Sequence, residues 1–354
     1  MLARLAESLQ SGGIAVTLAT FDGAAPAFPV SCKHVPLSVN REGPSVGRTL
    51  FAMPKLISRL RSLMRSGSFD LVISFMDQNN MVTLIAACGL AIPVVVSERI
   101  APQFSSITEL PRPLNVISLY LRKLLYRRAS AIVVQTEAAA RYFKERGLTG
   151  VRVIPNAART PPRDINSPIS PLPRPCILSL SRLVAQKRVD RIINAFSAAV
   201  PRFNTWHLII AGDGALKSAL EQQARDCGFA TRIHFIGTVT DPLALLAQSD
   251  IFVLASDYEG FPGALLEAMS MGVSSVAMRC PYGPEEIIRD GVDGRLVPLG
   301  NEQALVDVLA GLMADPQLRE KLGSAARGVV SRFGEREIVD QWISLIDSLC
   351  LTRA

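Results

Sequence analysis

The chain has 354 residues, of which 49% are hydrophobic and 19% charged, and it contains no low-complexity tract, so a globular protein is expected. It is long enough for two domains, because single hydrophobic cores stop growing at about 250–300 residues. The six cysteines lie far apart and form no C-x-x-C pair, which argues against a zinc site or a disulfide framework and indicates a reducing compartment.

The net charge of +7 is concentrated in the first half of the chain. Residues 1–155 hold 18 Lys and Arg against 9 Asp and Glu, whereas the remainder holds 20 against 22. This asymmetry indicates an anionic partner, either nucleic acid or a membrane surface. Nucleic acid is disfavoured, because no binding motif and no aromatic stacking platform occurs. No apolar run reaches the roughly 18 residues that span a bilayer, and no signal peptide is recognisable, so we expect a cytoplasmic protein.

Helical and strand-like patterns alternate along the first half. A helical pattern over residues 2–10 ends at two glycines, and a β-rich run follows over residues 14–18. Further helix and strand segments alternate over 56–64, 70–75, 81–88, 93–97, 116–126, 131–135 and 151–155. Alternation of this kind predicts a parallel sheet with helices on both faces.

A proline-rich stretch divides the chain. Residues 157–175 have no periodicity and are predicted to be an interdomain linker. The second half repeats the alternation, with strands over 176–180, 207–211, 232–236, 251–254 and 274–278. The predicted fold class is therefore α/β, with two Rossmann-like doubly wound parallel-sheet domains at residues 1–156 and 176–334.

Residues 251–269 read as a strand, a loop and a helix. An apolar run from Ile251 ends at an acidic loop that contains Gly and Pro, and Ala264 opens a helical pattern. Such a junction directs loop amides and a helix N-terminus at one point, which suits an anion, while Glu259 and Glu267 offer acceptors for sugar hydroxyls. Taken alone, the two glutamates also fit an ordinary turn with solvated carboxylates.

Two loops that follow other predicted strands add polar groups. Arg182 and Lys187 follow the strand at 176–180 and place two cations where α/β folds bind ligands, although a solvated basic loop would look the same. Gly283 and Pro284 follow the strand at 274–278 and open a helix whose N-terminal amides suit an anion. The alternative for the second loop is a plain helix start.

Gly212, Asp213 and Gly214 follow the strand at 207–211. They resemble the beginning of a dinucleotide-binding motif, but no third glycine occurs at the required spacing, so NAD binding is disfavoured. A structural turn remains an alternative for Asp213. The three histidines have no partners at metal-ligand spacing and no Asp-x-Asp motif occurs, so no metal site is predicted.

The sequence of residues 259–269, Glu-Gly-Phe-Pro-Gly-Ala-Leu-Leu-Glu-Ala-Met, resembles the nucleotide-sugar signature of retaining glycosyltransferases of family 4, which have the GT-B fold. The resemblance implies two domains facing a cleft, a C-terminal helix over 335–354 that returns to the first domain, and metal-independent sugar transfer from a UDP-sugar without a further cofactor. It implies catalytic roles for Arg182, Lys187 and Glu259. It implies donor binding by Gly212, Asp213, Gly214, Gly260, Phe261, Pro262, Gly263, Leu266, Glu267, Gly283 and Pro284.

The same resemblance extends to the first half. Ser97, Glu98 and Arg99 resemble a Ser-Glu-Arg sequence of bacterial polysaccharide and lipid-linked-oligosaccharide enzymes, so they are acceptor-side candidates, with a Glu98–Arg99 ion pair as the alternative. The implied partners are a nucleotide-sugar donor and a glycan or lipid-linked acceptor. Residues 114–128 combine an apolar face with clustered cations, which fits either contact with anionic lipid or a core-packed helix with a basic solvent face.

The start of the chain departs from the family pattern. Family members of this kind begin with a strand and a glycine-rich loop, whereas this chain begins with a helix. Because the first strand lies in the middle of a doubly wound sheet, its absence is expected to leave backbone groups unpaired. Two explanations stay open. The natural protein carries roughly 15 to 20 further residues, enough for a strand and a loop, or the chain is an inactive copy that binds nucleotide sugar or a partner enzyme without transfer.

Overall fold

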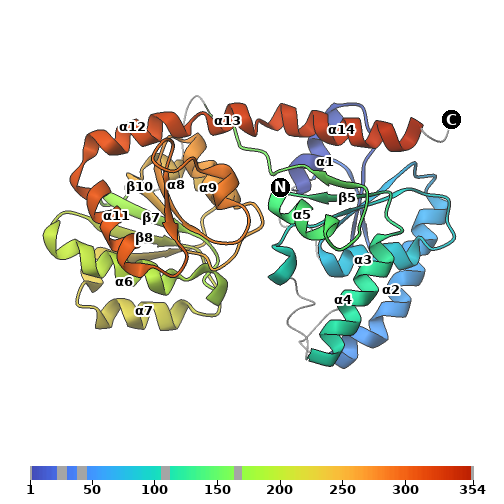
Figure 1. Ribbon diagram of the computed structural model, residues 1–354, viewed down its shortest axis with the longest axis horizontal. Helices are drawn as coiled ribbons and strands as arrows, with labels where there is room; N and C mark the ends of the chain where they lie inside the picture. The colour runs from blue at the N-terminus through green and yellow to red at the C-terminus, as the bar shows by residue number, and fades with distance from the viewer. Residues whose placement is uncertain (1, 22–29, 38–45, 105–111, 163–169, 352–354) are drawn as a thin grey trace. The chain divides into compact units, whose positions relative to one another are not determined.

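The computed structural model of the chain describes residues 2–21, 30–37, 46–104, 112–162 and 170–351. It divides into two compact units, of which the first comprises Met1–Asn156 with Arg336–Ala354 and the second comprises Ala157–Glu335. Every strand pair in the described ranges is parallel. The expected α/β class with two parallel-sheet units is confirmed (Figure 1).

The second unit contains a six-stranded sheet in the order β12-β11-β10-β7-β8-β9. Because β7 comes first in the chain and lies between β8 and β10, the chain winds outward from β7 in both directions. The carboxyl ends of all six strands therefore meet at one edge. The strands are β7 (Cys176–Leu180), β8 (His207–Ala211), β9 (Ile233–Gly237), β10 (Ile251–Leu254), β11 (Ser274–Arg279) and β12 (Arg295–Pro298).

Helices cover both faces of this sheet (Figure 1). Alternate residues of β10 point to opposite faces, so Ile251 and Val253 pack in one apolar cluster with Phe196, while Phe252 and Leu254 pack in the other. The fully apolar strands of this half thus have the pattern of a sheet buried on both sides. The helices are α6 (Val189–Ala199), α7 (Lys217–Asp226), α8 (Pro242–Ala247), α9 (Gly263–Ser270), α10 (Pro284–Ile287), α11 (Glu302–Ala314), α12 (Pro316–Ala326) and α13 (Val329–Arg332).

The first unit contains two separate sheets in its described residues. A four-stranded sheet has the order β3-β4-β5-β6, and β1 pairs with β2 in a sheet of its own. No described strand joins the two sheets, and Ile73 on β3 is only half-buried, whereas Val95 on β4 is completely buried. The strands are β1 (Thr17–Thr20), β2 (Lys33–Pro36), β3 (Val72–Phe75), β4 (Val94–Ser97), β5 (Ala131–Val134) and β6 (Val151–Val153).

Six helices accompany these sheets in the described ranges. The last one, α14, packs its apolar side on the first unit, where the Trp342 ring lies 6.1 Å from the Phe75 ring. None of the helices that the structure describes is both long and apolar enough to cross a membrane. The helices are α1 (Leu2–Ser11), α2 (Val46–Ser66), α3 (Asp77–Ala86), α4 (Arg112–Tyr126), α5 (Glu137–Lys144) and α14 (Glu335–Leu351).

The segment predicted as a linker is not free along its whole length. Ala158 is fully buried in the second unit, and its amide donates to the Phe333 carbonyl at 2.7 Å. Residues 163–169 of the predicted linker lie outside the described ranges. The predicted strand over 14–18 is shifted, because β1 begins at Thr17.

Candidate active site

The four loops singled out in the second half follow four neighbouring strands. They follow β7, β8, β10 and β11, which are adjacent in the sheet order β11-β10-β7-β8. Ligands of doubly wound sheets bind outside the carboxyl ends of the strands, at the point where the chain reverses its winding direction. That point lies between β7 and β10, so the loops after these two strands form the centre of the candidate site.

A short ion pair joins these two central loops. Lys187 Nζ lies 2.6 Å from Glu259 Oε1, and the two side chains are 15% and 7% exposed. The Ser256 hydroxyl donates to the same oxygen at 2.6 Å. Two of the three predicted catalytic residues are therefore in direct contact, and the Glu259 carboxylate is held by two donors on one side.

Backbone contacts fix the two loops to each other. The Gln186 side-chain amide donates to the Tyr258 carbonyl at 2.7 Å, and the Asp257 amide donates to the Gln186 carbonyl at 2.9 Å. Asp257 precedes Glu259 by two residues, and Gln186 precedes Lys187 by one. The relative position of the Lys187 and Glu259 side chains is thus determined by their neighbours as well as by their own attraction.

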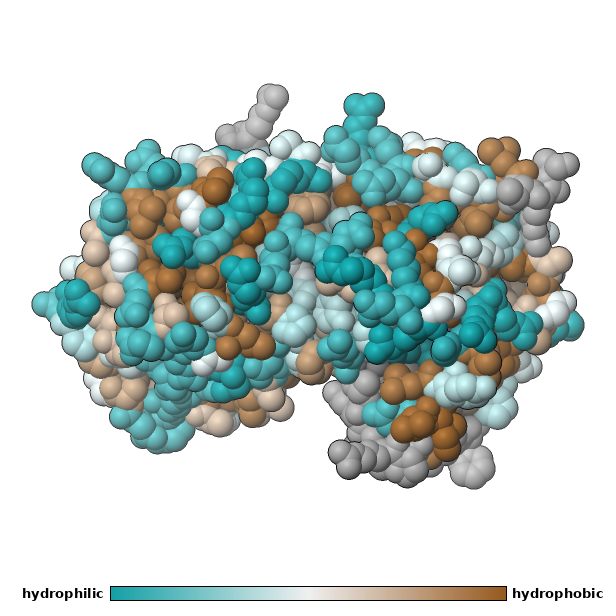
Figure 2. Space-filling view, in the orientation of Figure 1, coloured by the Kyte–Doolittle hydropathy of each residue, from teal (hydrophilic) through white to brown (hydrophobic). Residues whose placement is uncertain are grey.

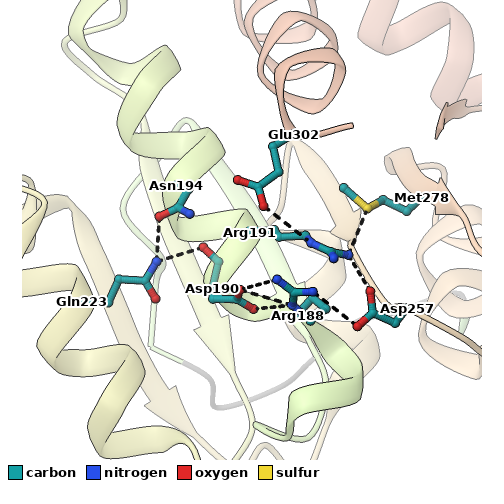
Figure 3. A network of polar contacts seen from close by, with 8 residues as sticks. All are labelled: Arg188, Asp190, Arg191, Asn194, Gln223, Asp257, Met278 and Glu302. Carbon is teal, nitrogen blue, oxygen red and sulfur yellow. Dashed lines mark hydrogen bonds and ion pairs between the residues drawn. The ribbon is translucent and has the colours of Figure 1, made fainter. Parts of the chain in front are cut away.

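A second polar network supports the β10–α9 loop (Figure 3). Arg191 of α6 donates to Asp257 at 2.6 Å, and its Nε lies 3.6 Å from a Glu302 oxygen at the start of α11. Arg188 lies 3.4 Å from Asp257 and donates three hydrogen bonds to Asp190. Arg188 adopts a left-handed conformation with φ of 47° just before α6, and its guanidinium reaches Asp257 in the loop.

Arg182 differs from Lys187 in its surroundings. Its side chain is exposed and makes no hydrogen bond or ion pair with the described residues, so its charge is available to an anion. The backbone beside it packs against the β8 loop, because the Leu183 amide donates to the Asp213 carbonyl at 2.9 Å. Gly212 has φ of 136°, and a Cβ there would lie 1.9 Å from the Ser181 carbonyl oxygen. Glycine is required at Gly212 for this close approach.

The remaining donor candidates lie around the start of α9. A Cβ on Gly283 would lie 2.7 Å from the Pro262 ring and 2.9 Å from the Gly260 oxygen, so the β11 loop packs directly on the β10–α9 loop. The N-cap residue of α9 is Pro262, which provides no side-chain cap, and Gly263 in the first turn is exposed. Phe261 is buried edge-to-face against Phe333, with 5.2 Å between ring centroids. This packing fixes the loop and leaves helix amides open to an anion.

Other members of the predicted donor set have separate roles in the structure. Glu267 is half-buried, and its Oε1 lies 3.8 Å from Arg159 Nη1. Leu266 is completely buried in the core beneath α9, so it positions the helix. Asp213 is 59% exposed and accepts the Gly214 amide, while Pro284 is buried at the start of the short helix α10. The roles of all these residues in donor binding stay predictions.

The acceptor-side candidates lie at the end of β4 in the first unit. Ser97 and Glu98 are buried, and Glu98 accepts a hydrogen bond from the Tyr126 hydroxyl. Burial raises the pKa of the Glu98 carboxyl to about 6. The Asn80 amide donates to Tyr126 Oη at 3.0 Å and to the Ser97 carbonyl at 3.2 Å. Glu98 thus belongs to a buried hydrogen-bonded cluster of the first unit.

Arg99 points to different partners, so the suggested Glu98–Arg99 ion pair is not formed among the described contacts. The Arg99 guanidinium lies 4.9 Å from the Phe75 ring centroid and donates to Asn156 at 3.1 Å. Burial lowers its pKa to about 9. Its Nε is buried and has no hydrogen-bond partner in the part of the chain that the structure describes, which leaves one donor of an acceptor-side candidate unused.

Several residues of these clusters were not predicted from the sequence. Ser256 and Arg159 contact the predicted site residues Glu259 and Glu267, and Gln186 and Asp257 join the two central loops to each other. Only Ser256 and Asp257 had a signal, since they lie in the acidic loop that follows an apolar strand. No cluster of three or more metal-ligating side chains occurs within the described ranges.

Two family models match the chain in succession. Residues 1–157 match the glycosyl transferase 4-like domain, and residues 162–329 match the glycosyl transferases of group 1. The chain belongs to the group 1 glycosyltransferases of family 4. The family inferred from residues 259–269 is therefore confirmed, and the enzyme class is glycosyl transfer.

Three relatives of this glycosyltransferase have names that refer to bacterial glycans. An exopolysaccharide phosphotransferase of Streptomyces coelicolor is 35% identical over 63% of this chain and only 24% of its own length. The lipopolysaccharide core glycosyltransferase LpsE of Rhizobium meliloti is 30% identical over 63% of this chain and 66% of LpsE. An α-1,4-N-acetyl-D-galactosaminyltransferase of Campylobacter jejuni, named for an undecaprenol-linked acceptor, is 26% identical over 81% of this chain and 77% of that protein.

Solved structures show that this glycosyltransferase has the GT-B fold. Sucrose-phosphate synthase from Thermosynechococcus elongatus has a TM-score of 0.84 at 19% identity and covers 99% of this chain and 92% of its own. The lipopolysaccharide outer core galactosyltransferase WaaB has a TM-score of 0.73 at 19% identity, with 98% and 94% covered. Anabaena HepE, solved with UDP-glucose, has a TM-score of 0.73 at 19% identity, with 94% and 99% covered.

Proposed function

We propose that this glycosyltransferase moves a sugar from a UDP-sugar to a glycan or lipid-linked glycan of a bacterial surface polysaccharide, with retention of the anomeric configuration and without a metal. The relatives named for lipopolysaccharide core and undecaprenol-linked glycans support the acceptor class. The solved complex of HepE with UDP-glucose supports the donor class. We place the protein in the cytoplasm, at the inner face of the cytoplasmic membrane.

The observation that carries the proposal is the arrangement of charged groups between the ends of β7 and β10, where the chain reverses its winding direction. Arg182 is exposed and without a described partner, Lys187 is held by Glu259, and the uncapped start of α9 follows the same loop. These groups together suit a diphosphate beside a sugar, because the cations and helix amides attract phosphate while the carboxylates accept hydrogen bonds from sugar hydroxyls.

The reaction would proceed on one face of the donor sugar. The bond from the anomeric carbon to the diphosphate oxygen breaks, the acceptor oxygen forms the new bond, and the acceptor proton passes to the departing phosphate oxygen. Arg182 and Lys187 would stabilise the charge that develops on the diphosphate. Glu259 and the Gly260–Phe261 backbone would hold the sugar, and Glu267 would accept a hydrogen bond from a ribose hydroxyl.

A thermal-shift screen of UDP, GDP and ADP sugars followed by a transfer assay tests the proposal. We expect a UDP-sugar to raise the melting temperature and to be consumed with a matching acceptor. Glu267→Ala should lower transfer at least roughly tenfold and leave the fold intact, since its carboxylate is half-buried at the surface of α9. Arg225→Ala on α7, whose guanidinium donates to the Gln222 side chain one turn away, serves as the control.

Two results would decide against this function. A folded Glu267→Ala protein with wild-type transfer would remove the assigned role of that residue. A wild-type protein that binds UDP-sugar but turns over none with any glycan or lipid-linked acceptor would support the alternative, an inactive homologue that binds nucleotide sugar.

A further inference from the structure

The outward side of α4 is apolar. Six of its large hydrophobic side chains are exposed, and the exposed fraction reaches 67% at Val116, 62% at Ile117 and 64% at Tyr120. Residues spaced by three or four positions lie on one side of a helix, so these side chains form one continuous stripe, which we call the α4 outer face. The α4 outer face consists of Leu114, Val116, Ile117, Tyr120, Leu121 and Leu124. Figure 2 shows brown surface where Figure 1 places α4.

The inward side of the same helix is partly charged. Arg122 is only 4% exposed, and its guanidinium lies 5.7 Å from the Phe143 ring centroid. Its charge also lowers the pKa of the buried Glu98 carboxyl, against the larger effect of burial. An ordinary surface helix turns its charges to water and a single apolar stripe to the core. On α4, Leu125 and Tyr126 face the core together with Arg122, and a second apolar stripe faces outward. A core-packed helix with a purely basic solvent face does not account for these exposed apolar side chains.

The sequence segments that contain α4 and its neighbour α2 carry basic residues and no acidic ones. The sequence from residue 110 to 136 contains five Lys and Arg and no Asp or Glu, and the same holds from residue 43 to 69, which includes α2. Arg61 of α2 donates to the Ala86 carbonyl at 2.7 Å, and Arg128 Nη2 lies 3.2 Å from Cys88 Sγ. Cations from both segments therefore gather at the end of α3, against which α2 and α4 both pack.

We infer that the α4 outer face inserts into the headgroup region of an anionic lipid bilayer, with Lys123, Arg127 and Arg128 against the lipid phosphates. Such a bilayer supplies an apolar layer and negative charge together, which is the combination that this helix presents. A second copy of the chain is a poorer partner, because pairing this face with itself would bring two sets of cations together without a carboxylate in either segment.

This inference extends the proposed function and depends on it only for the acceptor. A bilayer bound at α4 would bring a lipid-linked acceptor to the unit that carries Ser97, Glu98 and Arg99. The lipid contact itself requires no nucleotide sugar and no turnover, so the two ideas fail separately.

Vesicle sedimentation of the full-length protein tests the inference. We expect the wild type to sediment with vesicles that contain phosphatidylglycerol at low salt, to be released at high salt, and to remain in the supernatant with pure phosphatidylcholine. The triple variant Val116→Ser/Ile117→Ser/Tyr120→Ser should lower the partition coefficient at least roughly tenfold. Because these side chains are mostly exposed, circular dichroism and the melting temperature should match the wild type.

Two control variants separate this surface from general stickiness and charge. Val292→Ser/Leu299→Ser changes two side chains of the second unit that are 50% and 44% exposed, and vesicle binding should be unchanged. Arg127→Gln/Arg128→Gln keeps the apolar face, so it should weaken binding to phosphatidylglycerol vesicles and flatten the salt dependence.

Three results would overturn the inference. They are a wild type that stays in the supernatant with phosphatidylglycerol vesicles at low salt, a triple variant that binds like the wild type, and equal loss in the second-unit control. Failure in the first case, together with capture of a purified acidic protein, would assign the face to a protein partner.

UDP-sugar binding and transfer to a water-soluble acceptor should not change in the triple variant. A wild type that binds vesicles but transfers no sugar would contradict only the proposed function.

Discussion

Lys187 and Arg182 follow the same strand but have opposite environments. The Lys187 side chain is 15% exposed and lies 2.6 Å from Glu259, whereas Arg182 is exposed and has no described partner. Removing only one partner of a nearly buried ion pair lowers the free energy of unfolding by several kcal/mol, because the other charge stays buried without a partner. An exposed unpaired side chain contributes little to folding. Lys187 therefore has a structural role beside its proposed catalytic one, whereas Arg182 has only the proposed one.

The variants Lys187→Ala and Arg182→Ala should consequently differ in the free energy of unfolding and show a similar loss of UDP affinity. We expect Lys187→Ala to lower the free energy of unfolding by about 2–4 kcal/mol, since Glu259 keeps only Ser256 as a side-chain donor. Arg182→Ala should change it by less than about 0.5 kcal/mol. Both should weaken UDP binding roughly tenfold or more. Urea unfolding and calorimetric titration measure the two quantities.

Equal stability of the two variants would show that the Lys187–Glu259 contact does not hold the loops together. Unchanged UDP affinity in Arg182→Ala would remove the proposed phosphate role of that residue. Glu259→Gln is a useful third variant, because the amide oxygen can still accept from Ser256 while the charge is lost.

The residue scale also shows the limit of motif reading. The sequence placed Ser97, Glu98 and Arg99 at the end of a strand, and β4 does end at Ser97. It did not indicate that Glu98 turns inward to Tyr126 or that Arg99 stacks on Phe75, because these partners lie on elements distant in the sequence. The direction in which a side chain leaves a strand end depends on tertiary packing that a local motif does not record.

At the scale of elements, apolar runs were the reliable signal. The five strand segments predicted in the second half correspond to β7, β8, β9, β10 and β11. The short strand β2 was missed because Lys33–Pro36 contains a lysine, a histidine and a proline and has no apolar run. Helix α5 was missed although Thr136 caps it by accepting from the Ala139 amide, a local signal that was available.

The loop between β10 and α9 is held by elements that the motif does not include. Asp257 accepts from Arg191 of α6 at 2.6 Å and lies 3.4 Å from Arg188. Glu302 at the start of α11 lies 3.6 Å from the same Arg191. Three elements thus meet at one guanidinium (Figure 3), and the loop that carries Glu259 is attached to them through Asp257.

Asp257→Ala should therefore make this loop more mobile, although Asp257 is not one of the residues proposed to contact the ligand. We expect faster hydrogen exchange over residues 256–262 and a roughly tenfold loss of UDP affinity, because a small displacement of positioning groups is costly. Gln223→Ala, which removes only the contacts to Asp190 and Asn194 at the far end of the network, is the control. Exchange rates that match the wild type in Asp257→Ala would contradict this positioning role.

At the scale of the whole molecule, the chain is not two consecutive domains. The sequence divided it at a proline-rich stretch, and the family resemblance joined residues 335–354 to the first domain. In the structure, Arg336–Ala354 belongs to the first unit. The amphipathic pattern of the last helix was visible, with Ile338, Trp342, Leu345 and Ile346 all buried. Periodicity shows that such a helix needs an apolar surface and does not say which one, so only the family resemblance indicated the first domain.

The first unit should therefore depend on the end of the chain, and the second should not. Trp342 is 1% exposed and packs on Phe75, with the Arg99 guanidinium 5.7 Å from its ring centroid. Trp342→Ala should destabilise the first unit by about 3–5 kcal/mol through the cavity it leaves. Hydrogen exchange should then accelerate over β3–β6 and stay unchanged over β7–β12.

Asp347→Ala, an exposed change on the same helix, provides the matched control and should leave both exchange patterns as they are. UDP affinity offers an independent measure, because Lys187, Glu259 and Arg159 with all their described contacts belong to the second unit. Trp342→Ala should therefore bind UDP like the wild type below the melting temperature of the first unit. Equal acceleration in both sheets, or a parallel loss of UDP binding, would show that the two units unfold as one body and that the first unit's core is not stabilised independently.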